Sequence, residues 1–281
     1  MTIAQALDWA KSRLFEGESP AIDARVLLCH VLNCSTTTLL TYPEKPLTDA
    51  QIEQFTALIE QRKIGKPVSY LTGKQDFWTL TLNVNEHTLI PRPETELLVE
   101  RTLQLHELNP LKQPAILDLG TGTGAIALAL ASELPQSQVL AVDFIQEAVE
   151  LAKYNAQQLA LKNVSVLQSS WFSNIPQQSF DFIVTNPPYV ESQSPWLSEG
   201  DVRFEPDTAL TSGEDGLDDI RLIIDHAVTW LNPRGWLLIE HGHLQSEAIQ
   251  GLLVDHGYDS VTTESDYSGL PRMCYAQKRV A

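Results

Sequence analysis

From residue 115 onward, short apolar runs alternate with longer stretches whose apolar residues recur at helical spacing. Such runs are typical of buried parallel strands, and the stretches between them are typical of crossover helices. The last two apolar runs are separated by too few residues for a crossover helix, so we expect these two strands to pair antiparallel. The pattern predicts an α/β fold over residues 91–281, a doubly wound seven-stranded mixed sheet. The expected strands are 115–119, 138–142, 164–167, 180–184, 236–240, 260–263 and 273–277, and the expected helices are 125–131, 145–159, 216–231 and 244–256.

The first 75 residues carry a different pattern, with apolar residues at helical spacing throughout. Thr48 and Gln51 form a candidate capping box at the start of one helix. We predict a small helical bundle over 1–75 that recognises a partner, with a purely stabilising role almost as well supported. Residues 77–84 alternate with period two and indicate a strand, which with 89–90 predicts a β-hairpin linker over 76–90.

Composition narrows the class of protein. The formal net charge of −17 disfavours a direct nucleic-acid partner and favours a basic protein partner. Cys29, Cys34 and Cys274 form no CxxC pattern, which suits a reducing cytoplasm. No apolar run could span a bilayer and the N-terminus lacks signal-peptide features, so we expect a cytoplasmic protein without a membrane partner. His241 and His243 lack further ligands, so we predict no metal, and we expect a monomer.

A glycine-rich turn joins the strand 115–119 to a helix, in the order Gly120, Thr121, Gly122, Thr123, Gly124. Glycines at this place let the backbone approach a ligand closely. The same turn also satisfies the nicotinamide-cofactor fingerprint, so the turn alone leaves the ligand open.

Two further side chains follow neighbouring strands of the predicted sheet. Asp143 ends the next strand, where a carboxylate can accept both hydroxyls of a ribose or, alternatively, cap a helix. Trp171 follows the third strand and could flank an adenine ring or form a hydrophobic lid.

The strand 180–184 runs into Asn186, Pro187, Pro188 and Tyr189. Two prolines make the turn stiff, and the turn presents a side-chain carbonyl, backbone carbonyls and an aromatic ring. These groups can accept hydrogen bonds from a planar NH2 group and stack on it. A plain strand-ending turn is the alternative, which the full four-residue motif at a strand end disfavours.

Two other segments have both a structural and a functional interpretation. Pro93 begins a helix in the ordinary way, and a ligand near Thr95 or Arg92 is the less favoured interpretation. Residues 191–213 form a long polar loop, of a kind that is usually functional or mobile.

Together the motifs resemble class I S-adenosylmethionine-dependent methyltransferases. More narrowly, they resemble the bacterial glutamine methyltransferases that act on class 1 peptide chain release factors. One departure is Ile145, where the family more often has a small polar residue that caps a helix. The resemblance is carried by residues 90–96, 118–124, 171–172, 186–189, 204–206, 215–218 and 240–242.

The resemblance implies S-adenosyl-L-methionine as cofactor, with the turn 120–124 at its methionine end, Asp143 at the ribose and Trp171 at the adenine. It implies that residues 186–189 grip the glutamine of a Gly-Gly-Gln motif, with Asn186 also close to the cofactor. In the mechanism we expect, the Asn186 side-chain oxygen and the Pro187 carbonyl accept the two amide N–H bonds, and Tyr189 stacks on the amide.

Four other functions stay open at this point. A glutamine methyltransferase of a large-subunit ribosomal protein would use the same amide chemistry. An adenine-N6 DNA methyltransferase would share the turn but should carry a basic recognition region. A nicotinamide-dependent dehydrogenase would explain the glycines but not the turn 186–189, and a cofactor-binding scaffold without activity would not need that turn.

Overall fold

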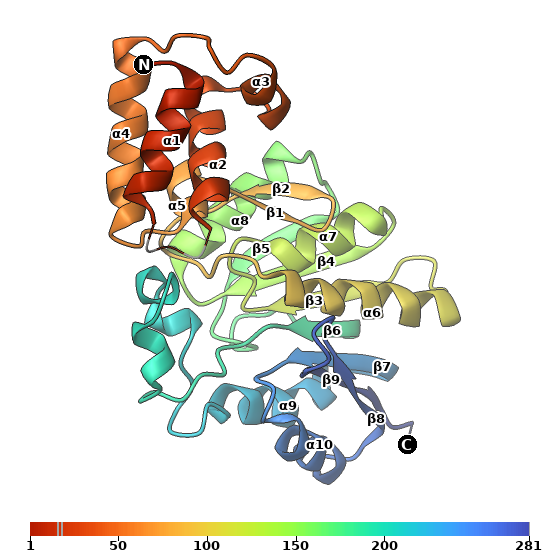
Figure 1. Cartoon of the computed structure of the whole chain (residues 1–281). Coiled ribbons are helices and arrows are strands. Elements are labelled where there is room, and N and C mark those ends of the chain that lie inside the picture. Colours follow the sequence, from red (N-terminus) through yellow and green to blue (C-terminus); the bar gives the residue numbers. More distant parts are fainter. Residues whose placement is uncertain (16, 18, 281) are drawn as a thin grey trace. The chain divides into compact units, whose positions relative to one another are not determined.

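The computed structural model describes residues 1–280 apart from Glu16 and Glu18. The chain forms two compact units, shown as ribbons in Figure 1. One, here called the helical unit, contains Met1–Lys74 and Ser198–Phe204. The other, here called the sheet unit, contains Gln75–Leu197 and Glu205–Ala281. No helix within the described residues is both long and apolar enough to cross a membrane.

The helical unit packs its helices around an apolar core that includes Ile3, Leu27, Phe55 and Ile59. The capping box predicted at Thr48 is present, because its hydroxyl accepts from the Gln51 backbone and the Gln51 side chain accepts from the Thr48 backbone. The helices are α1 (Ile3–Arg13), α2 (Pro20–Leu32), α3 (Thr36–Thr41), α4 (Asp49–Lys63) and α5 (Val68–Thr72).

The segment Ser198–Phe204 joins this unit from far along the sequence. Nη1 of Arg62 donates to Oδ1 of Asp201 over 2.7 Å, and Nε of the same guanidinium donates to Oδ2 of the buried Asp23 over 2.7 Å. Arg203 donates from Nη2 to the carbonyl of Ile64 over 2.6 Å. Charge-assisted bonds and a backbone contact therefore hold part of the predicted long loop on the helices.

The sheet unit is built on a seven-stranded sheet with the order β5-β4-β3-β6-β7-β9-β8. The first five strands in that order pair parallel, and β9 pairs antiparallel with both β7 and β8. The predicted doubly wound mixed sheet with an antiparallel end is confirmed. The strands are β3 (Ala115–Leu119), β4 (Gln138–Asp143), β5 (Val164–Gln168), β6 (Phe180–Thr185), β7 (Leu231–Glu240), β8 (Tyr258–Ser265) and β9 (Pro271–Lys278).

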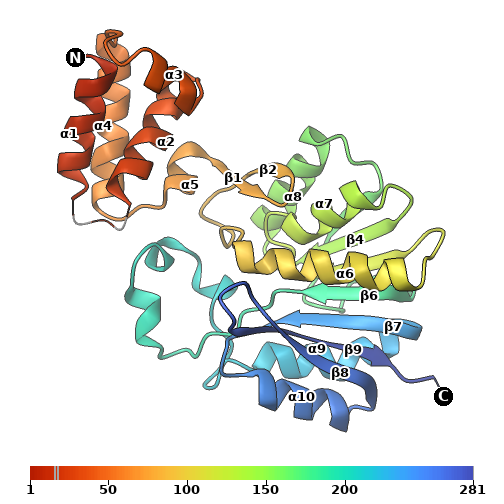
Figure 2. The ribbon, with the colours of Figure 1, turned by 45° about the vertical axis from the view of Figure 1, so that its right-hand side comes forward.

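Helices cover both faces of this sheet (Figure 2). One apolar core joins the sheet to α6, α7 and α8, and another joins it to α9 and α10. Every residue of α7 from Ala125 to Ala131 is buried, as expected for a helix that is apolar all round. The helices are α6 (Glu96–Leu108), α7 (Ala125–Glu133), α8 (Gln146–Gln158), α9 (Asp218–Trp230) and α10 (Ser246–Asp255).

The hairpin before the sheet differs from its predicted form. Its strands are β1 (Lys74–Phe77) and β2 (Leu80–Asn83), so the turn lies inside the alternating run 77–84, and residues 89–90 are not a strand. Trp78 stands at the turn with a φ of 56°. Its backbone N–H donates to Glu96 over 2.7 Å and its indole donates to Glu133 over 2.7 Å. These contacts with α6 and α7 stabilise a turn conformation that a bulky residue seldom adopts.

The order of the strands sets where a ligand can bind. From β3 the chain winds outward through β4 and β5, and it then returns to place β6 and β7 on the other side of β3. Such a switch point leaves a crevice outside the carboxyl ends of β3 and β6. The predicted loop after β6 is irregular and contains three short turns, η2 (Pro195–Ser198), η3 (Val202–Phe204) and η4 (Asp207–Ala209).

Candidate active site

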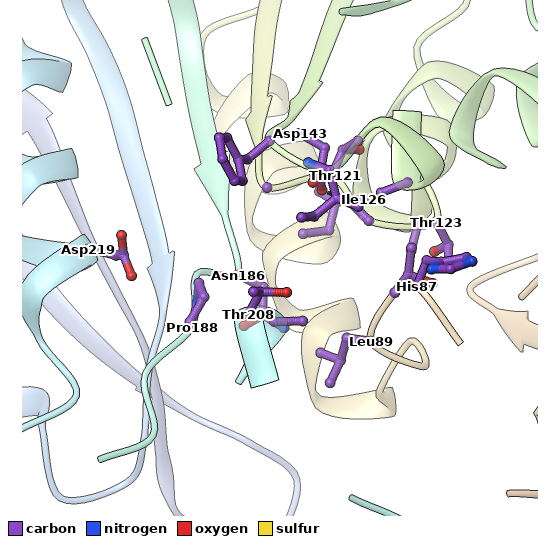
Figure 3. A pocket seen from close by; sticks show the side chains of 18 of the residues that line it. His87, Leu89, Thr121, Thr123, Ile126, Asp143, Asn186, Pro188, Thr208 and Asp219 are labelled. Atoms are coloured by element: carbon purple, nitrogen blue, oxygen red, sulfur yellow. Dashed lines mark hydrogen bonds between the residues drawn. The ribbon is translucent and has the colours of Figure 1, made fainter. Parts of the chain in front are cut away.

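A cavity of about 480 Å³ opens at the carboxyl ends of β3, β4 and β6 (Figure 3). All of its lining residues belong to the sheet unit. Of the residues that the sequence analysis assigned to the site, those in the lining are Gly120, Thr121, Gly122, Thr123, Asp143, Trp171, Asn186 and Pro188. Gly124, Pro187 and Tyr189 are not in the lining.

The glycine turn owes its shape to left-handed backbone conformations. The φ angles of Gly120, Gly122 and Gly124 are 71°, 54° and 87°, a region that side chains with a Cβ rarely adopt. A Cβ at Gly124 would also lie 2.9 Å from Cδ1 of Leu128, in the helix that follows. Gly124 therefore shapes the turn and packs it on α7, although it does not line the cavity.

Asp118, in the strand that precedes this turn, is fully buried and stabilises the turn through hydrogen bonds. Its Oδ2 accepts from the Thr121 hydroxyl over 2.6 Å and from the Ala127 backbone over 3.2 Å. Within the described residues its Oδ1 has no hydrogen-bond partner. Burial raises the pKa of Asp118 to about 7, although both hydrogen bonds favour the charged form.

Asp143 ends β4 and ties the glycine turn to the next helix. Oδ2 accepts from the Gly122 backbone over 2.8 Å, and Oδ1 accepts from the Ile145 backbone over 2.9 Å. Burial raises the pKa of this carboxyl, while these backbone bonds oppose the rise. A carboxylate has about four lone-pair sites, so Asp143 can accept further hydrogen bonds from a ligand in the cavity. Ile145 indeed supplies no side-chain cap to α8.

Trp171 lies against the glycine turn, because a Cβ at Gly120 would sit 3.5 Å from the edge of its ring. Its backbone is left-handed, with a φ of 47°. The indole Nε1 donates to Oδ1 of Asp219 over 3.0 Å, and Asp219 also lines the cavity. Oδ2 of Asp219 accepts from the Ser212 hydroxyl over 2.7 Å, so the ring has a fixed anchor.

Asn186 lies where β6 ends, next to a contact that the sequence did not single out. Its Nδ2 donates to the hydroxyl of Thr95 over 3.1 Å. Thr95 is the last residue of the short turn η1 (Pro93–Thr95), is 4% exposed and lines the cavity. Within the described residues no hydrogen bond to Oδ1 of Asn186 is found, so that oxygen is available to a ligand.

Tyr189 is held from several sides. Its backbone carbonyl accepts from the Gln245 side chain over 2.9 Å, and its backbone N–H donates to the Leu210 carbonyl over 3.2 Å. Its hydroxyl donates to Oε1 of Glu240 over 3.3 Å, and burial raises the pKa of that hydroxyl. The residue after the two prolines is thus anchored by side chains from β7 and from the start of α10.

The structure adds residues that the sequence analysis had not assigned to the site. Thr95 and Arg92, for which a ligand contact was the less favoured interpretation, both line the cavity. Asp219 and the segment around η4 also line it, and no local pattern pointed to them. Within the described residues, no three His, Cys, Asp or Glu side chains form a group that could hold a metal ion.

Family models match a segment of the helical unit and a segment of the sheet unit. A family model described as PrmC N-terminal domain matches residues 5–73, and one described as Methyltransferase small domain matches residues 94–198. A methyltransferase structure from Pyrococcus furiosus superimposes with a TM-score of 0.54 over 80% of this chain and 98% of its own. At 17% identity this likeness shows the fold alone.

Two relatives are similar over nearly their whole length. The release factor glutamine methyltransferase of Salmonella typhimurium is 50% identical over 264 residues, which cover 94% of each chain. That of Vibrio cholerae is 48% identical over 280 residues, which cover 99% of this chain and 97% of its own. Because this level of identity extends over both units, the chain belongs to the family of release factor glutamine methyltransferases.

Proposed function

We propose that this protein methylates the side-chain amide nitrogen of a glutamine in class 1 peptide chain release factors, within their Gly-Gly-Gln motif. S-adenosylmethionine is the methyl donor. The observation that carries the proposal is the position of Asn186 in the cavity with its NH2 group bound to Thr95. The remaining carboxamide oxygen is a hydrogen-bond acceptor of the kind that a substrate NH2 group requires.

The residues around the cavity fit this cofactor. Gly120 and Gly122 leave room for the methionine end, and Asp143 can still accept bonds from two ribose hydroxyls. The ring of Trp171, fixed by Asp219, offers an apolar face to the adenine region. The sulfonium of the cofactor supplies an electrophilic methyl group.

The amide nitrogen of the substrate is a poor nucleophile because its lone pair is delocalised into the carbonyl. We assign its activation to Oδ1 of Asn186 and the backbone carbonyl of Pro187. These two oxygens accept hydrogen bonds from the two N–H groups and point the nitrogen at the methyl group. We also assign to Tyr189 the stacking on the flat amide, although its side chain is not in the lining of the cavity. Alignment of this kind supplies about 7–11 kcal/mol in the best cases. No residue is assigned as a general base, because the proton can leave after attack.

We assign recognition of the protein substrate in part to the helical unit. The match of residues 5–73 to the PrmC N-terminal domain and the net charge of −17 support this assignment. An acidic surface favours a basic protein over a phosphate backbone. The proposal also includes a monomeric, cytoplasmic enzyme that acts without direct contact to nucleic acid or membrane.

The decisive experiment compares acceptors for methyl transfer. The protein is incubated with S-adenosylmethionine labelled in its methyl group and, separately, with purified release factors, ribosomal proteins or DNA. We expect label on the amide of one release-factor glutamine. Label that enters a ribosomal protein or DNA instead would refute the proposed substrate.

A variant tests the assigned chemistry. Asn186→Ala should lower kcat by about 100- to 1000-fold, as for the loss of one preorganised hydrogen-bonding group in other active sites. Isothermal titration should still detect binding of S-adenosylmethionine to the variant, and no binding of NAD to either protein. Turnover near that of the natural protein would exclude the assigned role of Asn186.

A further inference from the structure

A buried carboxylate lies beside the Asn186 turn and has no part in the mechanism above. Glu240 ends β7, which pairs in parallel with β6, with Ile239 opposite Thr185. Glu240 is 2% exposed, and its Oε1 accepts from the Tyr189 hydroxyl over 3.3 Å. Within the described residues its Oε2 has no hydrogen-bond partner. A buried acceptor without a partner is uncommon and requires an explanation.

The groups that face Glu240 come from several elements. Burial raises the pKa of Glu240 to about 7, and the nearby Glu94 of η1 raises it further. The Thr95 hydroxyl, Arg272 of β9 and the Tyr189 hydroxyl oppose this rise, so each lies close enough to stabilise the charged form. The carboxyl is therefore poised between its two protonation states near neutral pH.

Thr95 connects this carboxyl with Asn186. A threonine hydroxyl has one proton to donate and two lone pairs that accept. In the structure its oxygen accepts from Nδ2 of Asn186 over 3.1 Å, and the hydroxyl lies close enough to the Glu240 carboxyl to point its proton at it. When the proton points there, the hydroxyl can only accept from the asparagine.

The direction of these bonds decides how the Asn186 carboxamide is turned. A hydroxyl that can only accept must face the NH2 group of Asn186, so Oδ1 faces away from it and is presented to the substrate. If Thr95 donated to Asn186 instead, the carboxamide would flip and present two N–H donors to the substrate NH2, which is also a donor.

We propose that Glu240 is a positioning residue that acts through Thr95 to fix the carboxamide orientation of Asn186, and through Tyr189 to fix the turn that follows. This inference rests on the proposed function, because it assigns the orientation of a group that binds the glutamine amide. It assigns Glu240 no contact with substrate or cofactor.

The first test changes only the hydroxyl. Thr95→Val keeps the shape and removes both the donor and the acceptor, whereas Thr95→Ser keeps them. We expect Thr95→Val to lower kcat by about 2- to 10-fold, the range of one net hydrogen bond, with the Kd for S-adenosylmethionine unchanged. Thr95→Ser should recover most of that loss. Equal kcat values for the natural protein and Thr95→Val would overturn the inference.

The second test changes the carboxyl. In the natural protein kcat should rise with pH through about 7, as Glu240 ionises and Thr95 turns its proton toward it. In Glu240→Gln the rate should be lower at pH 8, and the rise centred near pH 7 should be lost. Thermal unfolding controls for folding, since removal of a buried charge should leave the variant at least as stable at pH 8.

The outcomes separate this inference from the function on which it rests. If the natural protein transfers no methyl group to release factors, the proposed function fails. If it does, and Glu240→Gln keeps the natural kcat and pH profile, the positioning role alone fails. A loss of kcat that only matches a loss of folded protein or of cofactor binding would also overturn the role.

Discussion

Replacing Asp118 by asparagine should change how the stability of the protein depends on pH. Asp118 is fully buried beneath the glycine turn, and one of its oxygens accepts from Thr121 and Ala127. In Asp118→Asn the amide oxygen can accept the same two bonds, while its NH2 group takes the place of the unpartnered oxygen. The energetic cost of burying that NH2 donor does not depend on pH. Any change with pH in the difference in free energy of unfolding between Asp118→Asn and the natural protein therefore comes from the carboxyl alone.

The pKa of Asp118 decides whether the stability of the protein rises or falls with pH. Burial raises the pKa of Asp118 from its ordinary value of 3.8 to about 7. The folded protein therefore keeps a proton that the unfolded chain loses first, and its stability falls as the pH rises through about 7. At 1.36 kcal/mol per pKa unit the whole effect is about 4 kcal/mol, of which about 3 kcal/mol falls between pH 5 and pH 8. The stability of Asp118→Asn relative to that of the natural protein should therefore increase by about 3 kcal/mol as the pH rises from 5 to 8.

The assay is urea unfolding of both proteins at pH 5, 6, 7 and 8, followed by near-UV circular dichroism. Asp255→Asn, on the exposed face of α10, controls for the loss of one negative charge. A free-energy difference between Asp118→Asn and the natural protein that stays constant from pH 5 to pH 8 would refute the reasoning. So would a difference that changes in the opposite direction.

Four other substitutions have defined outcomes. In Gly216→Ala the new Cβ would lie 2.2 Å from the Tyr189 carbonyl, and we expect a fall in kcat of about 100-fold, measured by methyl transfer. Arg62→Met leaves the buried carboxylate of Asp23 without its cationic partner and should lower the free energy of unfolding by about 3 kcal/mol, measured by thermal unfolding. Asp201→Asn, at the exposed end of the same guanidinium, should cost less than about 1 kcal/mol. Asp143→Ala should raise the Kd for S-adenosylmethionine by about 10- to 100-fold in isothermal titration, and an unchanged Kd would contradict the ribose contact.

Much of the sheet unit was predictable because its signals are local. Continuous apolar runs such as 180–184 indicate strands buried on both faces, and the helices between them make a parallel sheet the simplest solution. The spacing of the last two strands was enough to predict an antiparallel end. The glycines of 120–124 and the position of Asp143 likewise followed from the order strand, turn, helix, which places ligand groups at one edge of the sheet.

Other features depend on residues that are far apart in the sequence. Asn186 meets Thr95 across 91 positions, and the indole of Trp171 meets Asp219 across 48. The turn at Trp78 lies within an alternating run because α6 and α7 supply acceptors for it. No periodicity or local motif encodes such pairs.

The sequence by itself therefore determined the element types, the class of sheet and the motif that bears the chemistry. Only the tertiary structure decided which way the Asn186 carboxamide is turned and which side chains hold it. The physical reason is that apolar periodicity and turn residues act over a few neighbouring positions. The direction of a buried hydrogen bond is decided by whichever donors and acceptors packing brings together, and here they come from η1, from the turn after β6 and from β7.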